Sequence, residues 1–311
     1  MDKDKPGAFA PFAVVEQSPV AKMPAALRFT DAAGLPLAGL TALPALRDEL
    51  GPQAGDRVFI SGGAGGVGTL AIQLAVSMGA EVATTASPRG ADLVSSLGAK
   101  TVIGYREQKF KDVLRDDDGA FDLTGGQDLL DSFAILKPGT TTVSVTKAPE
   151  PTTARRDMGK GPLLAAVFGL LSVKIRREAR RHGASYRFLF MHPSGADLAH
   201  LAALVDAGEP KPVTDRVFPF EQFADGFSCL EQGCAEGQVV VETWACGGRA
   251  CWRYGAEEPR RDRSGRSKLV HRTCSSRTCS WRTRSLRWSR DPTFHEPDQP
   301  AAAAGEACPD P

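Results

Sequence analysis

A glycine-rich stretch has the residue types and spacing best suited to chemistry. Residues 63–68 follow the pattern G-x-G-x-x-G. Between a strand and a helix, the first glycine permits a tight turn and the second lets the backbone approach a pyrophosphate. The third lets the helix pack against the strand, and the helix amides bind the phosphates. The candidate cofactor residues here are Gly63, Ala64, Gly65, Gly66, Val67 and Gly68.

The flanking residues predict the setting that this motif requires. The β-prone run Arg57–Ser61 precedes the glycines, and apolar residues follow them at spacings of three and four. That spacing predicts a helix with one apolar face, with Gly79 as its C-cap. A turn that needs glycine only for steric reasons is the alternative. The further strand–helix units along the chain favour a dinucleotide site.

The end of the next predicted strand indicates which dinucleotide binds. An NAD site places an acidic residue there to hold the ribose 2′-hydroxyl. The stretch Thr84–Arg89 contains no acid, and Glu81 lies too early, at the start of the strand. Ser87 can hydrogen-bond a 2′-phosphate, and Arg89 can pair with it. We therefore expect NADP(H), with a solvated capping role as the alternative for Arg89.

Strand and helix patterns alternate through the middle of the chain. The predicted strands are 57–61, 81–85, 101–104, 121–124, 141–145, 186–191 and 238–242. The predicted helices are 67–78, 91–97, 127–136, 163–181 and 194–206. This alternation predicts an α/β fold with a doubly wound parallel (Rossmann-type) sheet that helices cover on both faces.

An ordered series of segments resembles a known superfamily. The segments are GDRVFISGGAGGVGTLAIQLA, LGAKTVIGYRE, FDLTGG, LKPGTTTVSV and DRVFPFEQFADGFSCLEQGCAEGQVVVE. From about Gly7 to Glu242 the chain is similar to medium-chain dehydrogenases/reductases, in the zinc-independent, zeta-crystallin-like quinone oxidoreductase branch. The resemblance implies an NADPH-binding sheet domain, a GroES-like barrel, and hydride transfer to a quinone or activated alkene.

The resemblance also implies roles for individual residues. Ser87, Arg89 and Tyr105 would hold the adenosine phosphate end of the cofactor. Toward the nicotinamide would lie Thr41, Gly125 with its neighbour Gly126, Val145 and Phe190. No catalytic side chain is assigned, so the proton is expected to come from solvent. The expected partner is a small electrophile, and the expected assembly is a homodimer.

The chain departs from the family pattern at both ends. It resembles an N-terminally truncated member, because AFAPFAVVEQSPVAKMP matches only the last barrel strands. Gln238 stands where the family usually has lysine. We expect a barrel remnant at 1–40, the Rossmann domain at 41–191, a closing helix and final strands at 192–243, and a tail at 244–311. Loss of the barrel should impair catalysis more than cofactor binding, so a non-catalytic NADPH-binding or interaction protein is the alternative.

The tail differs in composition from the rest of the chain. It carries 12 Arg and 1 Lys against 8 acids, with all 4 Trp and 5 of the 7 Cys. Its few large aliphatic residues cannot offset the entropy of ordering it, so we expect disorder. The pairs Cys246-x4-Cys251 and Cys274-x4-Cys279 lack apolar support for a zinc knuckle, and no metal site is expected.

One further motif suggests different chemistry. Tyr105 and Lys109 form Y-x-x-x-K, the catalytic pair of short-chain reductases, in which the lysine lies one helical turn from the tyrosine. Here the pair follows the third predicted strand, earlier than in those enzymes. A short-chain-type reductase that uses Tyr105 and Lys109 stays as an alternative.

Overall composition and hydropathy exclude several partners. With 38 basic and 37 acidic residues the net charge is +1, which gives no reason to expect nucleic acid. The longest apolar run, Leu163–Val173, is shorter than the about 20 residues that span a bilayer, so we expect a buried helix and no membrane partner. Cys229 and Cys234 suit a reducing compartment, so we expect a cytoplasmic location.

Overall fold

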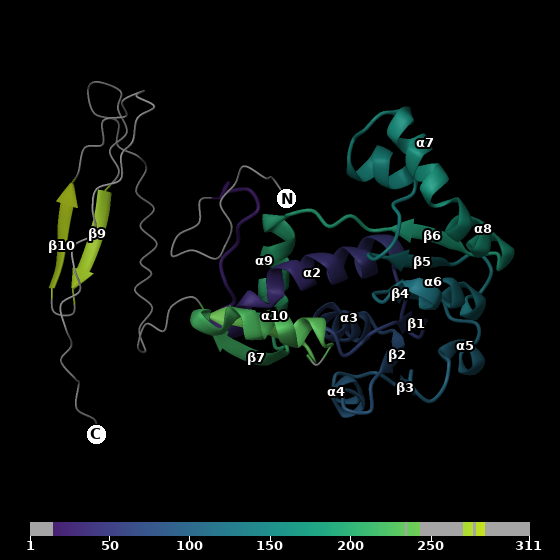
Figure 1. Ribbon diagram of the computed structural model, residues 1–311, viewed down its shortest axis with the longest axis horizontal. Coiled ribbons are helices and arrows are strands. Elements are labelled where there is room, and N and C mark those ends of the chain that lie inside the picture. Colours follow the sequence, from purple (N-terminus) through teal and green to yellow (C-terminus); the bar gives the residue numbers. More distant parts are fainter. Residues whose placement is uncertain (1–14, 234, 243–269, 276–277, 284–311) are drawn as a thin grey trace. The chain divides into compact units, whose positions relative to one another are not determined.

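Six parallel strands form the central sheet. In the computed structural model, which describes residues 15–233, 235–242, 270–275 and 278–283, they follow the order β3-β2-β1-β4-β5-β6 (Figure 1). Their bounds are β1 Arg57–Ile60, β2 Glu81–Ala86, β3 Thr101–Gly104, β4 Gly119–Asp122, β5 Thr141–Ser144 and β6 Ser185–Phe188. The order reverses between β1 and β4, which confirms the predicted doubly wound fold. β4 begins and ends two residues earlier than predicted.

Helices cover both faces of this sheet and build two cores. One face carries α2 Leu35–Pro44, α3 Gly66–Ser77, α4 Ala91–Ser96 and α9 Gly195–Asp206, and the other carries α5 Phe110–Val113, α6 Gly126–Ser132 and α8 Val173–Arg181. Alternate residues of a strand point to opposite faces. Val58 and Ile60 of β1 therefore pack in one core, and Phe59 packs in the other.

The apolar run at 163–173 is not the buried helix that we expected. It forms α7 Pro162–Leu171, which ends at Ser172, where α8 starts in a new direction. Leu163 and Leu170 are 81% and 75% exposed, and the buried residue of α7 is Ala165. Both sheet faces already carry other helices, so no core is left for α7, which stands clear of the sheet in Figure 1.

A small second sheet follows α9. β7 Thr214–Pro219 pairs in parallel with β8 Gln238–Glu242, and a 3-10 turn, Phe220–Gln222, leads into α10 Phe223–Glu231. α10 packs on this pair at Gly226, where an added Cβ would lie 3.3 Å from the Phe218 ring. Strand periodicity predicted β8, whereas β7 and α10 were implied only by the resemblance.

The first described residues are not strands. Residues 15–28 form turns and loops, where the resemblance implied the last barrel strands, and residues 1–14 lie outside the described chain. α1 Phe29–Ala33 follows, and α2 crosses position 40, the predicted boundary between barrel remnant and sheet domain. A π-helical turn, Ala45–Leu50, continues α2 toward β1.

The chain divides into two compact units, Met1–Cys246 and Gly247–Pro311. In the second unit β9 Val270–Ser275 pairs antiparallel with β10 Thr278–Thr283. The other tail residues, Cys246 and Cys251 among them, lie outside the described chain. Among the described residues, every helix is too short or too polar to cross a membrane.

Two neighbouring carboxyl groups before β4 respond to folding in opposite ways. Burial raises the pKa of Asp117 to about 7, although Arg57 lies 3.6 Å away. Burial also acts against the charge of Asp118, but a 2.5 Å hydrogen bond from Lys137 and the backbone amide of Arg57 outweigh it and lower the pKa of Asp118.

We predict that Asp117→Asn stabilises the protein at pH 8 and not at pH 4. Between about pH 4 and the folded-state pKa of about 7, the folded chain binds a proton that the unfolded chain lacks. This group therefore lowers the free energy of unfolding by about 1.4 kcal/mol for each unit of pH increase in that range. Denaturant unfolding at several pH values measures the slope. Asp118→Asn is the matched control and should destabilise at neutral pH, with the loss disappearing in acid.

Candidate functional site

The glycine loop lies where the sequence predicted, directly after β1. Gly62 turns the chain at φ +66°, a left-handed conformation that suits glycine. The amide of Gly63 donates to the Thr85 carbonyl of β2 at 3.1 Å. A Cβ on Gly63 would lie 2.1 Å from Thr84 Oγ1. The tight turn thus falls at Gly62, and Gly63 is needed because the loop presses against β2.

The last glycine of the motif lets α3 start against the loop. A Cβ on Gly68 would lie 2.4 Å from the Gly62 carbonyl oxygen and 2.7 Å from the Gly63 Cα. α3 begins at Gly66, so the amides of its first turn have no acceptor within the helix. These amides and the positive end of the helix dipole form a site for phosphate oxygens. A dinucleotide pyrophosphate therefore fits this loop.

The chain near residue 237 also contributes to the loop. The Gly237 amide donates to the Ala64 carbonyl at 2.8 Å, and Gly65 and Gly237 form a parallel bridge. The Gln238 side chain lies beside Gly66, since an added Cβ there would be 2.4 Å from its Nε2. Sequence reasoning named Gln238 as a family position but missed Gly237. The glycine between Glu236 and Gln238, at the start of β8, was the feature of the sequence that could have pointed to this contact.

The residues predicted to hold the adenosine phosphate end come together at two neighbouring strands. Ala86 of β2 pairs with Gly104 of β3, so Ser87 and Tyr105 leave the sheet side by side. Ser87 Oγ accepts the Gly90 amide at 3.1 Å, and Tyr105 is 54% exposed.

Arg89 follows Ser87 and is ion-paired. Its Nε lies 3.1 Å from Glu236, and its Nη2 lies 3.6 Å from Asp215, so the guanidinium contacts the same C-terminal segment that crosses the glycine loop. The side chain is still 56% exposed. A phosphate bound here would contact Arg89, whose positive charge is already balanced by the carboxylates of Glu236 and Asp215.

A buried carboxylate organises the other half of the site. Asp122, the last residue of β4, is 1% exposed. Its Oδ1 accepts the Gly125 amide at 2.8 Å and lies 3.3 Å from the Ser61 hydroxyl. Its Oδ2 accepts the hydroxyls of Ser144 at 2.7 Å and Thr146 at 3.0 Å. Asp122 therefore joins the loops that follow β1, β4 and β5. It occurs in FDLTGG, but sequence reasoning did not single it out.

The residues predicted near the nicotinamide are spread over this end of the sheet. Gly125 has φ +71°, and a Cβ there would lie 2.5 Å from Thr146 Oγ1. Val145 is partly buried, and its amide donates to the Asp122 carbonyl at 3.3 Å. Thr41 is buried in α2, where its hydroxyl donates to the Leu37 carbonyl. Gly125 and Val145 thus share the Asp122 network, and Thr41 does not.

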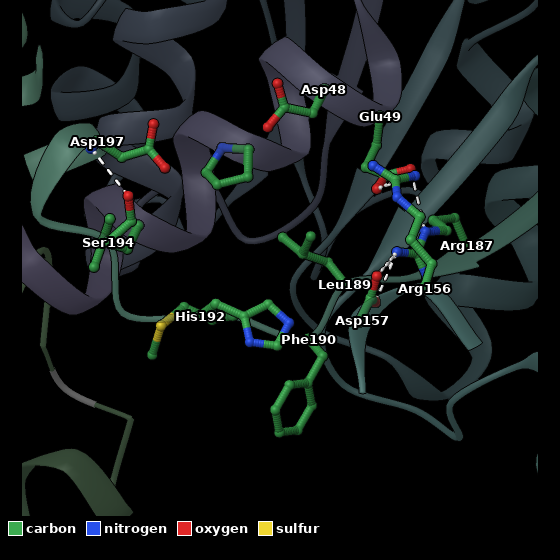
Figure 2. A pocket seen from close by; sticks show the side chains of 13 residues that line it. Asp48, Glu49, Arg156, Asp157, Arg187, Leu189, Phe190, His192, Ser194 and Asp197 are labelled. Carbon is green, nitrogen blue, oxygen red and sulfur yellow. Dashed lines mark hydrogen bonds and ion pairs between the residues drawn. The ribbon is translucent and has the colours of Figure 1, made fainter. Parts of the chain in front are cut away.

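Phe190 lines a pocket that is separate from the Asp122 network. A pocket of about 350 Å³ lies between α2, the π-helical turn and the chain after β6 (Figure 2). Phe190 lines it and stacks edge-on against His192 at 5.4 Å. No residue of the glycine loop is among the described residues that line it. The pocket and the glycine loop are therefore formed by different residues.

Buried charges form one wall of that pocket. The Arg187 side chain is 8% exposed and forms ion pairs with Glu49 at 3.1 Å, Glu150 at 2.9 Å and Asp157 at 2.7 Å. Arg156 forms a second ion pair with Glu49, also at 3.1 Å. Figure 2 shows Arg187 and Arg156 between Glu49 and Asp157. The network ties the π-helical turn, the chain after β5, and β6 together, so its role is structural.

The Y-x-x-x-K alternative is wrong. Tyr105 lies in a turn after β3, and Lys109 precedes α5 in extended backbone, so the two are not one helical turn apart. Among the described residues, no group of three or more His, Cys, Asp or Glu side chains is placed to hold a metal ion.

The chain is similar to several known oxidoreductases. A family model described as zinc-binding dehydrogenase matches residues 97–241. The mitochondrial NAD(P)H oxidoreductase RTN4IP1 of Danio rerio is 36% identical, over 76% of this chain and 63% of that protein. The chloroplastic NADPH-dependent alkenal/one oxidoreductase of Arabidopsis thaliana is 34% identical, over 76% of this chain and 53% of that protein.

A solved structure shares the fold. The quinone oxidoreductase from Coxiella burnetii aligns with a TM-score of 0.60 and 31% identity, over 70% of this chain and 62% of that one. The chain thus spans between 53% and 63% of the length of these three relatives.

We predict that Gly68→Ala lowers stability and weakens dinucleotide binding. The methyl group would overlap backbone atoms of Gly62 and Gly63, and overpacking of this kind costs about 1–3 kcal/mol. Gly169→Ala is the matched control, because Gly169 also lies in a helix and its nearest neighbour would be 3.4 Å away. The control should be neutral or stabilising. Denaturant unfolding and NADPH fluorescence measure both effects, and a Gly68→Ala protein as stable as the control contradicts the packing argument.

We also predict that Asp122→Ala lowers the free energy of unfolding by about 3 kcal/mol or more, because each buried donor left without an acceptor costs about 1–3 kcal/mol. Asp128→Ala is the control. The Asp128 carboxylate accepts a 3.0 Å hydrogen bond from the Thr124 hydroxyl and is less buried than Asp122. Asp128→Ala should therefore lower the free energy of unfolding by less than about 1 kcal/mol. Equal losses in the two variants would contradict a central role for Asp122.

Proposed function

Because the chain belongs to the medium-chain dehydrogenase/reductase superfamily, we propose that it binds NADPH and transfers hydride, without zinc, to a quinone or an activated alkene. The glycine loop carries this proposal. Its closest contacts, at Gly63 and Gly68, tolerate no side chain, and it ends at the open amides of α3. The named relatives are an NAD(P)H oxidoreductase, an alkenal/one oxidoreductase and a quinone oxidoreductase.

The choice of NADPH over NADH rests on the ends of β2 and β3. The stretch Thr84–Arg89 contains no acidic residue, whereas Ser87 and Arg89 can both donate to a 2′-phosphate. Arg89 would exchange its carboxylate partners for phosphate, which it can bind through two parallel N–H bonds. Tyr105, exposed beside Ser87, would cover the adenosine.

Each part of the chain has a limited task in this proposal. When bound, the nicotinamide supplies the hydride. The amides of Gly66 and Val67 would hold the pyrophosphate, and Gln238 could donate a hydrogen bond there without adding charge. Asp122 would hold Gly125 and the β5 loop in place beside the ring. We assign no side chain to proton transfer, and water would supply the proton.

A non-catalytic NADPH-binding protein is the second candidate. One observation favours it: Arg89 already contacts Glu236 and Asp215. Binding without turnover would support this candidate and overturn the reductase.

The assembly and the compartment are further predictions. A homodimer remains our expectation for assembly. The cytoplasmic location, which rested on the two cysteines Cys229 and Cys234, also stays a prediction. The two relatives' names place them in mitochondria and chloroplasts. Fractionation of the native cells would decide the compartment.

We predict that Arg89→Ala weakens NADPH binding by about 10-fold to 100-fold, the range for one charge-assisted hydrogen bond. NADH binding should be unchanged, because it has no 2′-phosphate. Lys100→Ala is the control, since it removes a positive charge at the opposite end of β2 and β3. Fluorescence titration of the full chain gives both affinities, and a simple benzoquinone then tests turnover. If parent chain and variants bind neither coenzyme, the proposed function is wrong.

A further inference from the structure

An exposed apolar helix lies directly beside a basic one. Five large aliphatic side chains of α7 and the start of α8 are exposed by 43–81%: Leu163, Val167, Leu170, Leu171 and Val173. α7 contains no charged residue. Exposed apolar surface of this extent marks an interaction site.

The residues that follow carry strong positive charge. α8 contains Lys174, Arg176, Arg177, Arg180 and Arg181 against one acid, Glu178, which gives a net charge of +4. Glu178 is paired with Arg181 at 2.9 Å. Ile175 and Ala179 anchor α8 in the core that contains Phe59, whereas Lys174, Arg177 and Arg181 are exposed.

A hollow on α8 has the size and charge for an anionic group. A pocket of about 240 Å³ lies between α8 and residues 150–152, with Arg176 and Arg180 in its wall. The two arginines are one helical turn apart on the same face of α8. The one carboxylate that lines the pocket, Glu150, is already bonded to Arg187.

We propose that α7 and α8 together dock on the surface of an anionic phospholipid bilayer. The leucine side chains of α7 would insert among the lipid chains, and the basic side chains of α8 would pair with the anionic headgroups. A second copy of this chain fits less well, because a two-fold interface places the same patch on both partners and so supplies almost no acidic groups to pair with the cations of α8. No membrane partner was expected from the sequence, since no segment can span a bilayer. Lying on the surface requires only one exposed face.

The test is flotation of the full chain with vesicles. Phosphatidylcholine vesicles containing about one third phosphatidylserine should bind the protein, and pure phosphatidylcholine vesicles should bind it at least about tenfold less, because the cations then lack partners. High salt should weaken binding by screening. Absence of binding to the anionic vesicles overturns the proposal.

Variants separate this surface from the arginines of the tail. Leu170→Ser with Leu171→Ser, and separately Lys174→Ala with Arg177→Ala, should each lower the bound fraction on anionic vesicles about tenfold. Leu37→Ser is the matched control, because Leu37 is 66% exposed on another helix. It should bind as the parent does, and all variants should melt as the parent does.

Two outcomes would contradict the proposal. Equal vesicle binding by the parent and both double variants would place the contact elsewhere in the chain. Sedimentation could also show that the parent chain is a dimer and that the Leu170→Ser, Leu171→Ser variant is a monomer. In that case a second copy of the chain, and not a bilayer, covers this surface. None of these measurements depends on NADPH or on turnover, so they stand apart from the proposed function.

Discussion

The carboxylate of Asp122 is the interaction on which the site depends. The carboxyl ends of parallel strands leave backbone and hydroxyl groups that the sheet does not pair. Asp122 accepts hydrogen bonds from Gly125 in the loop after β4, from Ser144 at the end of β5, and from Thr146 in the loop after β5. A buried charge is stable only when it is bonded in this way. The hydrogen bonds that satisfy the buried oxygens of Asp122 are therefore the same ones that shape the loops.

The two halves of the candidate site are held by different physical means. Around the glycine loop, the constraint is steric, because α3 starts in contact with Gly62 and Gly63. Around Gly125 the constraint is electrostatic and centres on Asp122. The segment Glu236–Gln238 contacts the first half through Ala64 and Arg89. A substitution in one half need not disturb the other.

Local patterns predicted the sheet, most of its helices and the glycine loop, because the strand and helix periods and the motif are all short-range. The exposure of α7 was not predictable in this way. Whether a run such as Leu163–Val173 is buried depends on whether a sheet face is still open, and that is decided by helices elsewhere in the chain. The partners of Arg89 and Asp122 were missed for a related reason: Glu236, Ser144 and Thr146 are distant in sequence and meet these residues only in the folded chain.

The bridge between Gly65 and Gly237 has a consequence for the order in which the molecule forms. Sheet strands can pair as they are synthesised, but the glycine loop acquires its neighbour only after β7 and α10 have been made. Contacts of such high sequence separation form late, because the intervening chain must first close. Any ligand held by the loop would also stabilise the segment around Gly237 by mass action. Coenzyme binding would thus stabilise the folded state of the carboxyl-terminal part of the first unit, which forms last.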